Sequence, residues 1–162
     1  MNNFELLDKF YSSFKHGDAN LMNDCYHPNV EFKDPAFGIL KEGKPSLMWE
    51  MLLSNKEAAP KISFKILEAD VHSGKAEWKA EYFFGPQKRR VINNVKSEFI
   101  FNDGKIIKHT DTFDIWKWSK QALGPLGYLL GWTPLMKVIV QKMANKNLDK
   151  YMNSTVSASQ NK

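Results

Sequence analysis

The sequence predicts an α+β fold in which helices come first and a curved antiparallel sheet wraps on them. Three segments, at about 3–16, 18–28 and 44–60, carry apolar side chains at helical spacing. Four segments between about 62 and 118 then show the alternating pattern of half-buried strands. This order differs from the strand–helix alternation that builds a parallel sheet, so we expect the sheet and the N-terminal helices to bury one another's apolar faces.

Helix boundaries follow from capping and breaking residues. Gly17 ends the first helix, and Asp18 is a good N-cap for the second. The second helix is expected to continue through Cys25 and Tyr26 until Pro28 stops it. The third helix is expected to begin at about residue 44 and to end before residue 60.

Turn residues separate the four strands that follow. The strands are expected at about 62–66, 76–82, 91–101 and 106–118. The intervening turns carry Ser73-Gly74, Gly85-Pro86 and Asn102-Asp103-Gly104, the last being a strong hairpin signal. These four strands form a meander, because each is joined to the next by a short turn.

A fifth strand precedes the third helix and carries an inward carboxylate. Val30, Phe32 and Asp34 occupy alternate positions, so the three side chains share one face. Pro35 cannot extend a central ladder, and the strand therefore ends just after Asp34. A carboxyl group among apolar side chains is costly unless something satisfies or uses it. Asp34 is therefore a candidate functional residue.

The C-terminal section is unusual in its composition. From Gln121 to Met136 there is no charged side chain. The segment is nevertheless too short for a membrane span, and glycine and proline residues interrupt it. A terminal helix is expected to begin at Thr133-Pro134. The expected organisation is a core over 1–118, a helical extension over 119–152 that packs on the core, and a disordered tail over 153–162.

The uncharged segment has three alternative interpretations. It can fold back on its own domain, which we favour, or it can cover a pocket as a lid. It can also form a surface for a dimer or a membrane, aided by Lys137, Lys142 and Lys146. The favoured interpretation predicts no membrane contact.

Composition limits the function classes. The 162 residues suit a single domain, and 43% hydrophobic with 13% aromatic residues could line a deep apolar cavity. The net charge of +5 is scattered along the chain, so we do not expect nucleic-acid binding. The single Cys25 excludes an intramolecular disulfide and is typical of a reducing compartment. Without a signal-peptide pattern at the N-terminus, we expect a cytoplasmic protein.

Three features together resemble the nuclear transport factor 2-like superfamily. They are the run from Tyr26-His27-Pro28 to Phe32-Lys33-Asp34-Pro35 after two helices, the four-strand meander, and Asn102-Asp103-Gly104-Lys105-Ile106-Ile107 leading to 109–114. The resemblance covers residues 3 to 118 and implies the cone-shaped α+β fold of ketosteroid isomerase and the SnoaL-like polyketide cyclases. That superfamily contains isomerases, dehydratases, cyclases, epoxide hydrolases and non-catalytic binders. It is also compatible with a homodimer formed through the outer face of the sheet.

The resemblance places the general base of ketosteroid isomerase on Asp34. It places the oxyanion-hole tyrosine of that enzyme on Phe10, which has no hydroxyl, and its protonated aspartic acid on Ser97. Paired donors of this kind supply several kcal/mol of transition-state stabilisation. We therefore do not expect steroid isomerisation by that mechanism.

The last strand offers a different set of polar groups. Ile107, His109, Asp111 and Phe113 alternate along it and share one face. If the apolar members face the core, His109 and Asp111 go with them and meet Asp34 in one apolar cavity. In this hypothesis Asp34 abstracts a proton or activates water, His109 acts as the partner acid, and Asp111 orients the imidazole.

Purely structural roles remain open for the same residues. His109 and Asp111 can form a buried pair that holds two strands in register, and Asp34 can cap the turn after Pro35. We expect no metal, because no second histidine stands at ligand spacing, and no organic cofactor. The residues expected to line a ligand pocket are Phe10, Phe14, Phe32, Trp49, Trp78, Ser97, Phe99 and Phe113.

Two functions are compatible with this set. The first is a cofactor-independent enzyme that performs acid–base chemistry, of isomerase, cyclase, dehydratase or hydrolase type, on a small hydrophobic molecule. The alternative is a non-catalytic carrier or sensor that holds an apolar ligand in the same pocket.

Overall fold

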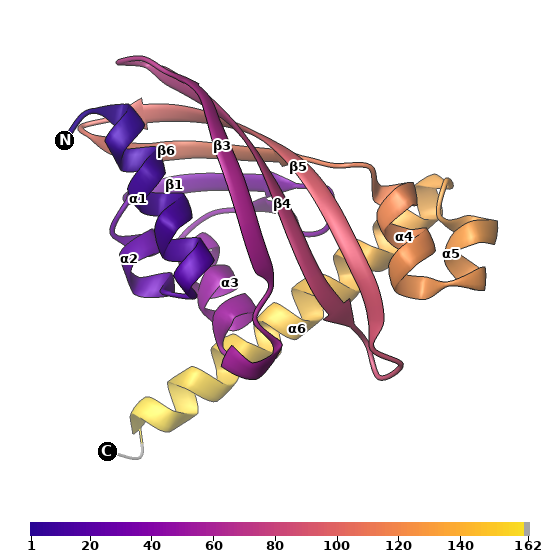
Figure 1. The fold of residues 1–162 in the computed structure, drawn as a ribbon. Helices are drawn as coiled ribbons and strands as arrows, with labels where there is room; N and C mark the ends of the chain where they lie inside the picture. The colour runs from indigo at the N-terminus through magenta and orange to yellow at the C-terminus, as the bar shows by residue number, and fades with distance from the viewer. Residues whose placement is uncertain (161–162) are drawn as a thin grey trace.

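A six-stranded curved sheet with helices against its inner face forms the body of the protein (Figure 1). The computed structural model describes residues 1–160. The strands are β1 (Tyr26–Asp34), β2 (Gly38–Leu40), β3 (Lys61–Ala69), β4 (Ser73–Phe84), β5 (Arg89–Asn102) and β6 (Lys105–Thr112). The helices are α1 (Asn3–His16), α2 (Ala19–Asn23), α3 (Lys44–Leu53), α4 (Ile115–Leu123), α5 (Pro125–Leu130) and α6 (Pro134–Gln160), with a 3-10 turn, η1 (Lys56–Ala58).

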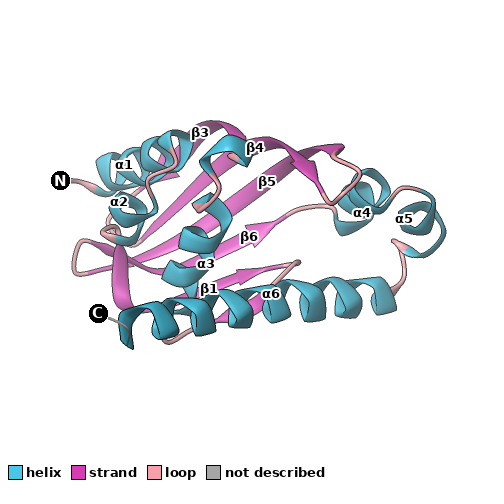
Figure 2. Cartoon of the chain, turned by 90° about the horizontal axis from the view of Figure 1, so that it is seen from below, coloured by secondary structure: helices cyan, strands magenta, loops and turns pink. Residues whose placement is uncertain are grey.

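The strand order is β2-β1-β6-β5-β4-β3. The α+β class, the curved sheet and the N-terminal helices are confirmed. One pairing differs from the antiparallel expectation, because β1 runs parallel to β6. Its register pairs Lys33 with Thr110, so Asp34 and Asp111 lie at the same end of two neighbouring strands. Figure 2 shows α1, α2 and α3 across one face of the sheet and α6 along the β1 side.

The second helix is shorter than expected. It ends at Asn23, and the chain enters β1 at Tyr26 rather than continuing as helix to Pro28. Pro28 is accommodated within β1 because the pairing register with β6 shifts between Tyr26 and Glu31. Cys25 therefore lies in the connection, buried, and not on a helix.

The last strand is also shorter than expected. β6 ends at Thr112, and Asp114 caps the new helix α4 by accepting a 2.9 Å hydrogen bond from the Lys117 N–H. Within β6 the alternation is interrupted, because the register with β5 shifts between Ile100 and Phe101. Ile106 is buried as a result, and Ile107 does not share the fully buried face of His109 and Asp111.

The terminal helix α6 is longer than expected. It begins at Pro134 as predicted and continues through Gln160, where a disordered tail from residue 153 was expected. Residues 161–162 of that tail lie outside the described residues. Among the α6 side chains that the structure describes, Met136, Val140 and Leu148 are buried.

Two apolar clusters join these elements. The larger one fills the space between α1, α3 and the sheet, and the smaller one joins β5, α4 and α6 through Val91, Trp118, Ala122, Met136 and Val140. Among the described residues, no helix is long and apolar enough to cross a membrane.

Candidate active site

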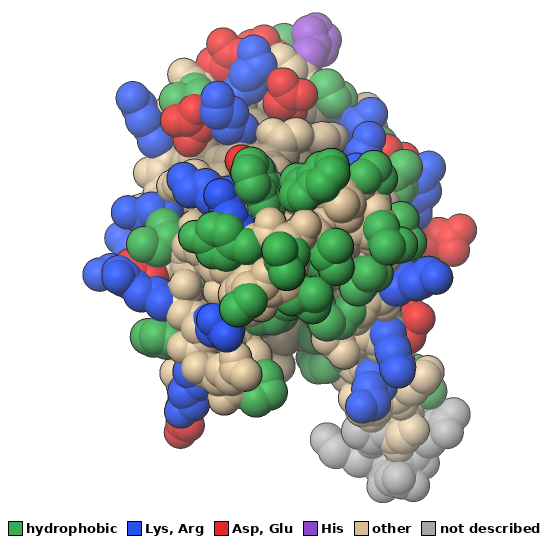
Figure 3. Space-filling model, turned by 90° about the vertical axis from the view of Figure 1, so that its right-hand side faces the viewer, with side chains coloured by type: hydrophobic (Ala, Val, Ile, Leu, Met, Phe, Trp, Pro, Cys, Tyr) green, Lys and Arg blue, Asp and Glu red, His purple; other side chains and the backbone are tan. Residues whose placement is uncertain are grey.

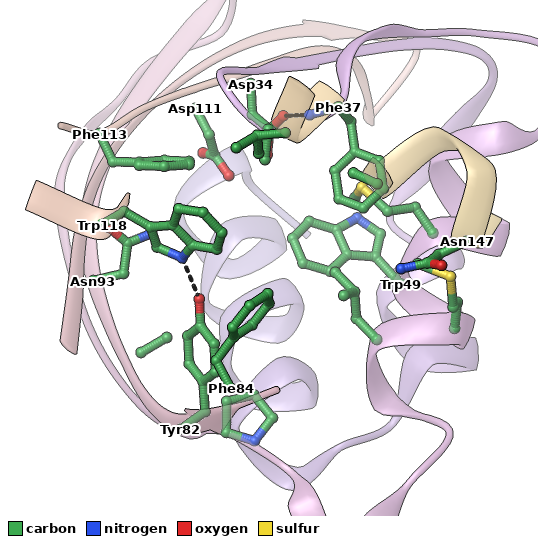
Figure 4. A pocket seen from close by; sticks show the side chains of 18 of the residues that line it. Asp34, Phe37, Trp49, Tyr82, Phe84, Asn93, Asp111, Phe113, Trp118 and Asn147 are labelled. Carbon is green, nitrogen blue, oxygen red and sulfur yellow. Dashed lines mark hydrogen bonds between the residues drawn. The ribbon is translucent and has the colours of Figure 1, made fainter. Parts of the chain in front are cut away.

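A mainly apolar cavity of about 320 Å³ lies between the two clusters, bounded by the sheet and by α3, α4 and α6 (Figure 4). This volume is at the small end of the range for ligand pockets. The aromatic residues that line it are Phe14, Phe32, Phe37, Trp49, Trp78, Tyr82, Phe84, Phe113 and Trp118. The polar side chains on its wall, apart from the Tyr82 hydroxyl and the tryptophan N–H groups, are Asp34, Asn93, Asp111 and Asn147.

Asp34 stands at the end of β1 and borders the cavity. Its Oδ1 accepts a 2.5 Å hydrogen bond from the Phe37 N–H, so the carboxyl group caps the turn after Pro35 as well as facing the cavity. Burial raises the pKa of Asp34 to about 7. The Phe37 hydrogen bond opposes this rise, and the negative charge of Asp111 adds to it. At neutral pH this carboxyl group can therefore either accept or donate a proton.

Asp111 is the second carboxyl group on the cavity wall. It is 4% exposed, and Figure 4 shows its carboxylate pointing into the cavity. Its Oδ1 accepts hydrogen bonds from His109 Nε2, at 2.9 Å, and from Ser97 Oγ. Both of these bonds fall on Oδ1, which leaves Oδ2 as the oxygen available to the cavity.

Ser97 accepts two hydrogen bonds behind Asp111. It lies opposite Asp111 in the β5–β6 register. Its Oγ accepts from the Tyr11 hydroxyl at 2.8 Å and from Trp78 Nε1 at 3.0 Å, and its own hydrogen goes to Asp111. Because burial raises the pKa of Tyr11 well above its ordinary value, Tyr11 stays protonated and remains a donor.

A second chain of hydrogen bonds leads through Tyr26 to His109. Trp49 Nε1 donates to the Tyr26 hydroxyl at 2.8 Å, and that hydroxyl lies 2.8 Å from His109 Nδ1. Burial also raises the pKa of Tyr26. The arrangement is complete when Tyr26 donates to Nδ1 and a neutral imidazole donates from Nε2 to Asp111. All the hydrogen bonds of the network then lead to one carboxylate oxygen, Oδ1 of Asp111.

The structure brings some of the expected site residues to the cavity and leaves others behind it. Those on the cavity wall are Asp34, Asp111, Phe14, Phe32, Trp49, Trp78 and Phe113. Those not on the wall are His109, Phe10, Ser97 and Phe99, all buried behind it. His109 therefore lies behind Asp111, which is the reverse of the arrangement expected from the sequence. Asp111 faces the cavity, and the imidazole orients it.

Sequence reasoning missed several residues of this site. Tyr82 could have been found from the sequence, because it follows Trp78 and Ala80 at strand spacing and so shares their face. The Tyr82 hydroxyl accepts a 2.8 Å hydrogen bond from Trp118 Nε1. Tyr11 supplies the hydroxyl that Phe10, its neighbour, lacks. No sequence signal linked Val140 and other α6 residues to the cavity, because the path of the chain after β6 decides their place.

Metal ligands are not gathered here. Among the described residues, no three histidine, cysteine or acidic side chains converge on a point where a cation could bind.

Comparison with known proteins finds similar structures. No protein-family model and no curated protein matches the sequence. A candidate polyketide cyclase from Pseudomonas putida aligns over 75% of this chain and 98% of its own, with a TM-score of 0.64 and 16% identity. TerC, co-crystallised with polyporic acid, aligns over 74% of this chain and 96% of its own, with a TM-score of 0.60 and 17% identity.

An LEH-like epoxide hydrolase from M. tuberculosis aligns over 78% of this chain and 92% of its own. Its TM-score is 0.56 and its identity 21%. At these identities the likeness concerns the fold, and function has to be argued from the site. With its curved open sheet, its N-terminal helices and these neighbours, the chain has the fold of the nuclear transport factor 2-like superfamily.

Proposed function

We propose that the protein is a cofactor-independent enzyme that performs acid–base chemistry on a small hydrophobic molecule. The observation that carries this proposal is that two carboxyl groups, Asp34 and Asp111, border one apolar cavity while burial raises the pKa of Asp34 to about 7. A perturbed carboxyl group beside a second one is typical of sites that transfer protons.

In the proposed reaction Asp34 is the general base. With a pKa of about 7 it is close to the optimum for proton transfer at neutral pH. It removes a proton from a substrate carbon or from a water molecule. Asp111, oriented by Ser97 and His109, stabilises positive charge or holds a hydroxyl group of the substrate.

The shape of the cavity supports a compact and apolar substrate. Its wall is largely aromatic, and Tyr82 adds a hydroxyl whose oxygen already accepts from Trp118. The hydrogen of that hydroxyl is therefore available to an oxygen atom of the substrate. The named activities of two neighbours, a candidate polyketide cyclase and an epoxide hydrolase, lie within this range of chemistry.

An isotope experiment tests the proposal without a known substrate. The protein is incubated with a panel of small hydrophobic epoxides, cyclic ketones and hydroxy ketones in water carrying deuterium and oxygen-18. Deuterium on carbon reports proton abstraction, and oxygen-18 in the product reports water addition. We expect Asp34→Asn to lower either signal by about 100-fold or more, as loss of a general base does.

Asp103→Asn is the matched control, because Asp103 lies in an exposed turn with positive φ that asparagine adopts readily. Turnover that survives Asp34→Asn unchanged would contradict the proposal. Ligand retention without any isotope incorporation would instead favour a carrier.

A further inference from the structure

Helix α5 and its neighbours present large apolar side chains to the solvent. We name as the α5 face the exposed residues Trp116, Leu126, Tyr128, Leu129, Trp132 and Leu135, which are between 42% and 72% exposed. Figure 3 shows a continuous apolar patch on this side of the molecule, with lysine and arginine, and some acidic side chains, around it. The uncharged segment 121–136 was expected to fold back on its own domain, and it does so only in part.

The way α5 packs explains this exposure. A Cβ atom at Gly127 would lie 1.9 Å from the Ser119 carbonyl oxygen, and one at Gly131 would lie 2.9 Å from Trp116 Cδ1. The glycines therefore form the side of the segment that packs closely on α4, and the leucines and aromatic rings are left outside. An ordinary surface helix buries its large apolar side chains, so this arrangement is inverted.

The chain segment that carries the α5 face has charges of one sign. Between Asp114 and Asp149 there is no acidic residue, and the charged side chains are Lys117, Lys120, Lys137, Lys142 and Lys146. The Lys120 Nζ lies 4.1 Å from the centre of the Trp116 ring and 5.6 Å from that of Tyr128. The Arg89 guanidinium group lies against Gly124, at the turn between α4 and α5.

We propose that the α5 face docks on an anionic lipid bilayer. Tryptophan, tyrosine and leucine flanked by lysine are the side chains that favour the boundary between lipid chains and headgroups. Anionic headgroups supply the counter-charge that the segment between Asp114 and Asp149 lacks. A symmetric contact between two copies would instead bring lysines against lysines with no acidic partner between Asp114 and Asp149.

The docked helices also border the cavity. Trp118 of α4 and Val140 and Met143 of α6 line it. Docking would therefore hold the cavity wall beside the lipid, where apolar molecules concentrate. The docking proposal does not depend on the acid–base chemistry proposed above.

Vesicle sedimentation of the full chain tests the proposal. Two vesicle types are compared, phosphatidylcholine alone and phosphatidylcholine with about 30% phosphatidylglycerol, each at low and high salt. We expect binding to the anionic vesicles, weakened by salt, and little binding to the neutral ones. Leu129→Glu should weaken binding by about tenfold or more, because it places a charge at the centre of the apolar patch.

Val71→Glu is the matched control. Val71 is 77% exposed and Leu129 is 72% exposed, and Val71 lies in the β3–β4 turn at the other end of the molecule (Figure 1). Its substitution should leave binding unchanged.

A second pair of variants tests the charges. Replacing Lys117, Lys137 and Lys142 together by glutamine should weaken binding on the order of 100-fold. Replacing Lys65, Lys79 and Lys96, three exposed lysines of the sheet, removes the same charge and should have a much smaller effect. Equal losses in the two triple variants would overturn the proposal, and so would equal binding to neutral and anionic vesicles. A dimer in solution that Leu129→Glu dissociates, with no vesicle binding, would assign the face to a second copy instead.

Discussion

The imidazole of His109 lies behind the carboxylate of Asp111, to which its Nε2 donates a 2.9 Å hydrogen bond. The two side chains are 1% and 4% exposed, so the pair is almost fully enclosed. Of the two side chains, only Asp111 reaches the cavity. The cavity therefore has two carboxyl groups in different environments. Asp111 is held by a buried hydrogen-bond network, and Asp34 stands at the end of β1.

Ser97→Ala tests the network behind Asp111. The Ser97 hydroxyl accepts from Tyr11 and Trp78 and donates to Asp111. Its removal leaves the Tyr11 hydroxyl and Trp78 Nε1 without a partner, while Asp111 Oδ1 keeps its bond from His109. An unsatisfied buried group costs about 1–3 kcal/mol, and relaxation recovers part of this. We expect the free energy of unfolding to fall by about 3 kcal/mol, measured by denaturant titration.

The control is Ser119→Ala. Both serines are buried, but the Ser119 hydroxyl has no hydrogen-bond partner among the described residues. Its removal should leave stability unchanged within about 0.5 kcal/mol or raise it. Equal losses for the two variants would show that the network does not stabilise the fold.

Asp34→Asn should make the stability of the protein less dependent on pH. The pKa of Asp34 rises from 3.8 to about 7 on folding, so between these values the folded chain keeps a proton that the unfolded chain has released. Stability contributed by that proton is lost as the pH rises through this window, up to about 4 kcal/mol, and less because Asp34 is partly exposed.

Asparagine stays neutral and its Oδ1 can still accept from the Phe37 N–H. We therefore expect the variant to be more stable than the natural protein at pH 8 and similar to it at pH 4, by denaturant titration at both. A difference that is the same at both pH values would contradict the shifted pKa.

The inward position of Asp34 could be predicted from the sequence because it depends on alternation alone. Val30 and Phe32 are buried on the same face, and Pro35 follows the last residue of β1. That Asp111 and not His109 would face the cavity could not be predicted. It depends on which of two neighbouring side chains on one strand face lies nearer the cavity, and packing of Phe10, Phe99 and Trp49 around the imidazole decides that.

The predicted ends of one helix and one strand were wrong for local reasons. The helix expected to reach Pro28 ends at Asn23, because the pairing of Tyr26 with Ile106 favours the strand. The strand expected to reach residue 118 ends at Thr112, because Asp114 caps a helix. In both cases a contact formed by another part of the fold, or a single capping side chain, outweighed the apolar pattern.

Gly127→Ala tests the close packing of α5 on α4. Alanine is the better helix former by about 1 kcal/mol. Its Cβ would lie 1.9 Å from the Ser119 carbonyl oxygen, however, so the two helices must separate. We expect the steric effect to exceed the helix propensity and the melting temperature to fall by several degrees.

Gly85→Ala is the comparison for this variant. A Cβ at Gly85 meets no atom within 4 Å, and only its φ of +70° resists substitution. Its cost should be about 1 kcal/mol. A smaller melting-temperature change for Gly127→Ala than for Gly85→Ala would show that the helices can part without cost.

The carboxyl carbon of Asp34, followed by NMR as a function of pH, tests the central claim most directly, and Asp34→Asn identifies its signal. Burial in the cavity predicts a titration midpoint of about 7. Asp111→Asn should lower this midpoint, because the charge of Asp111 contributes to raising it. A midpoint near 4 in the natural protein would contradict the account, because Asp34 would then be an ordinary turn-capping carboxylate.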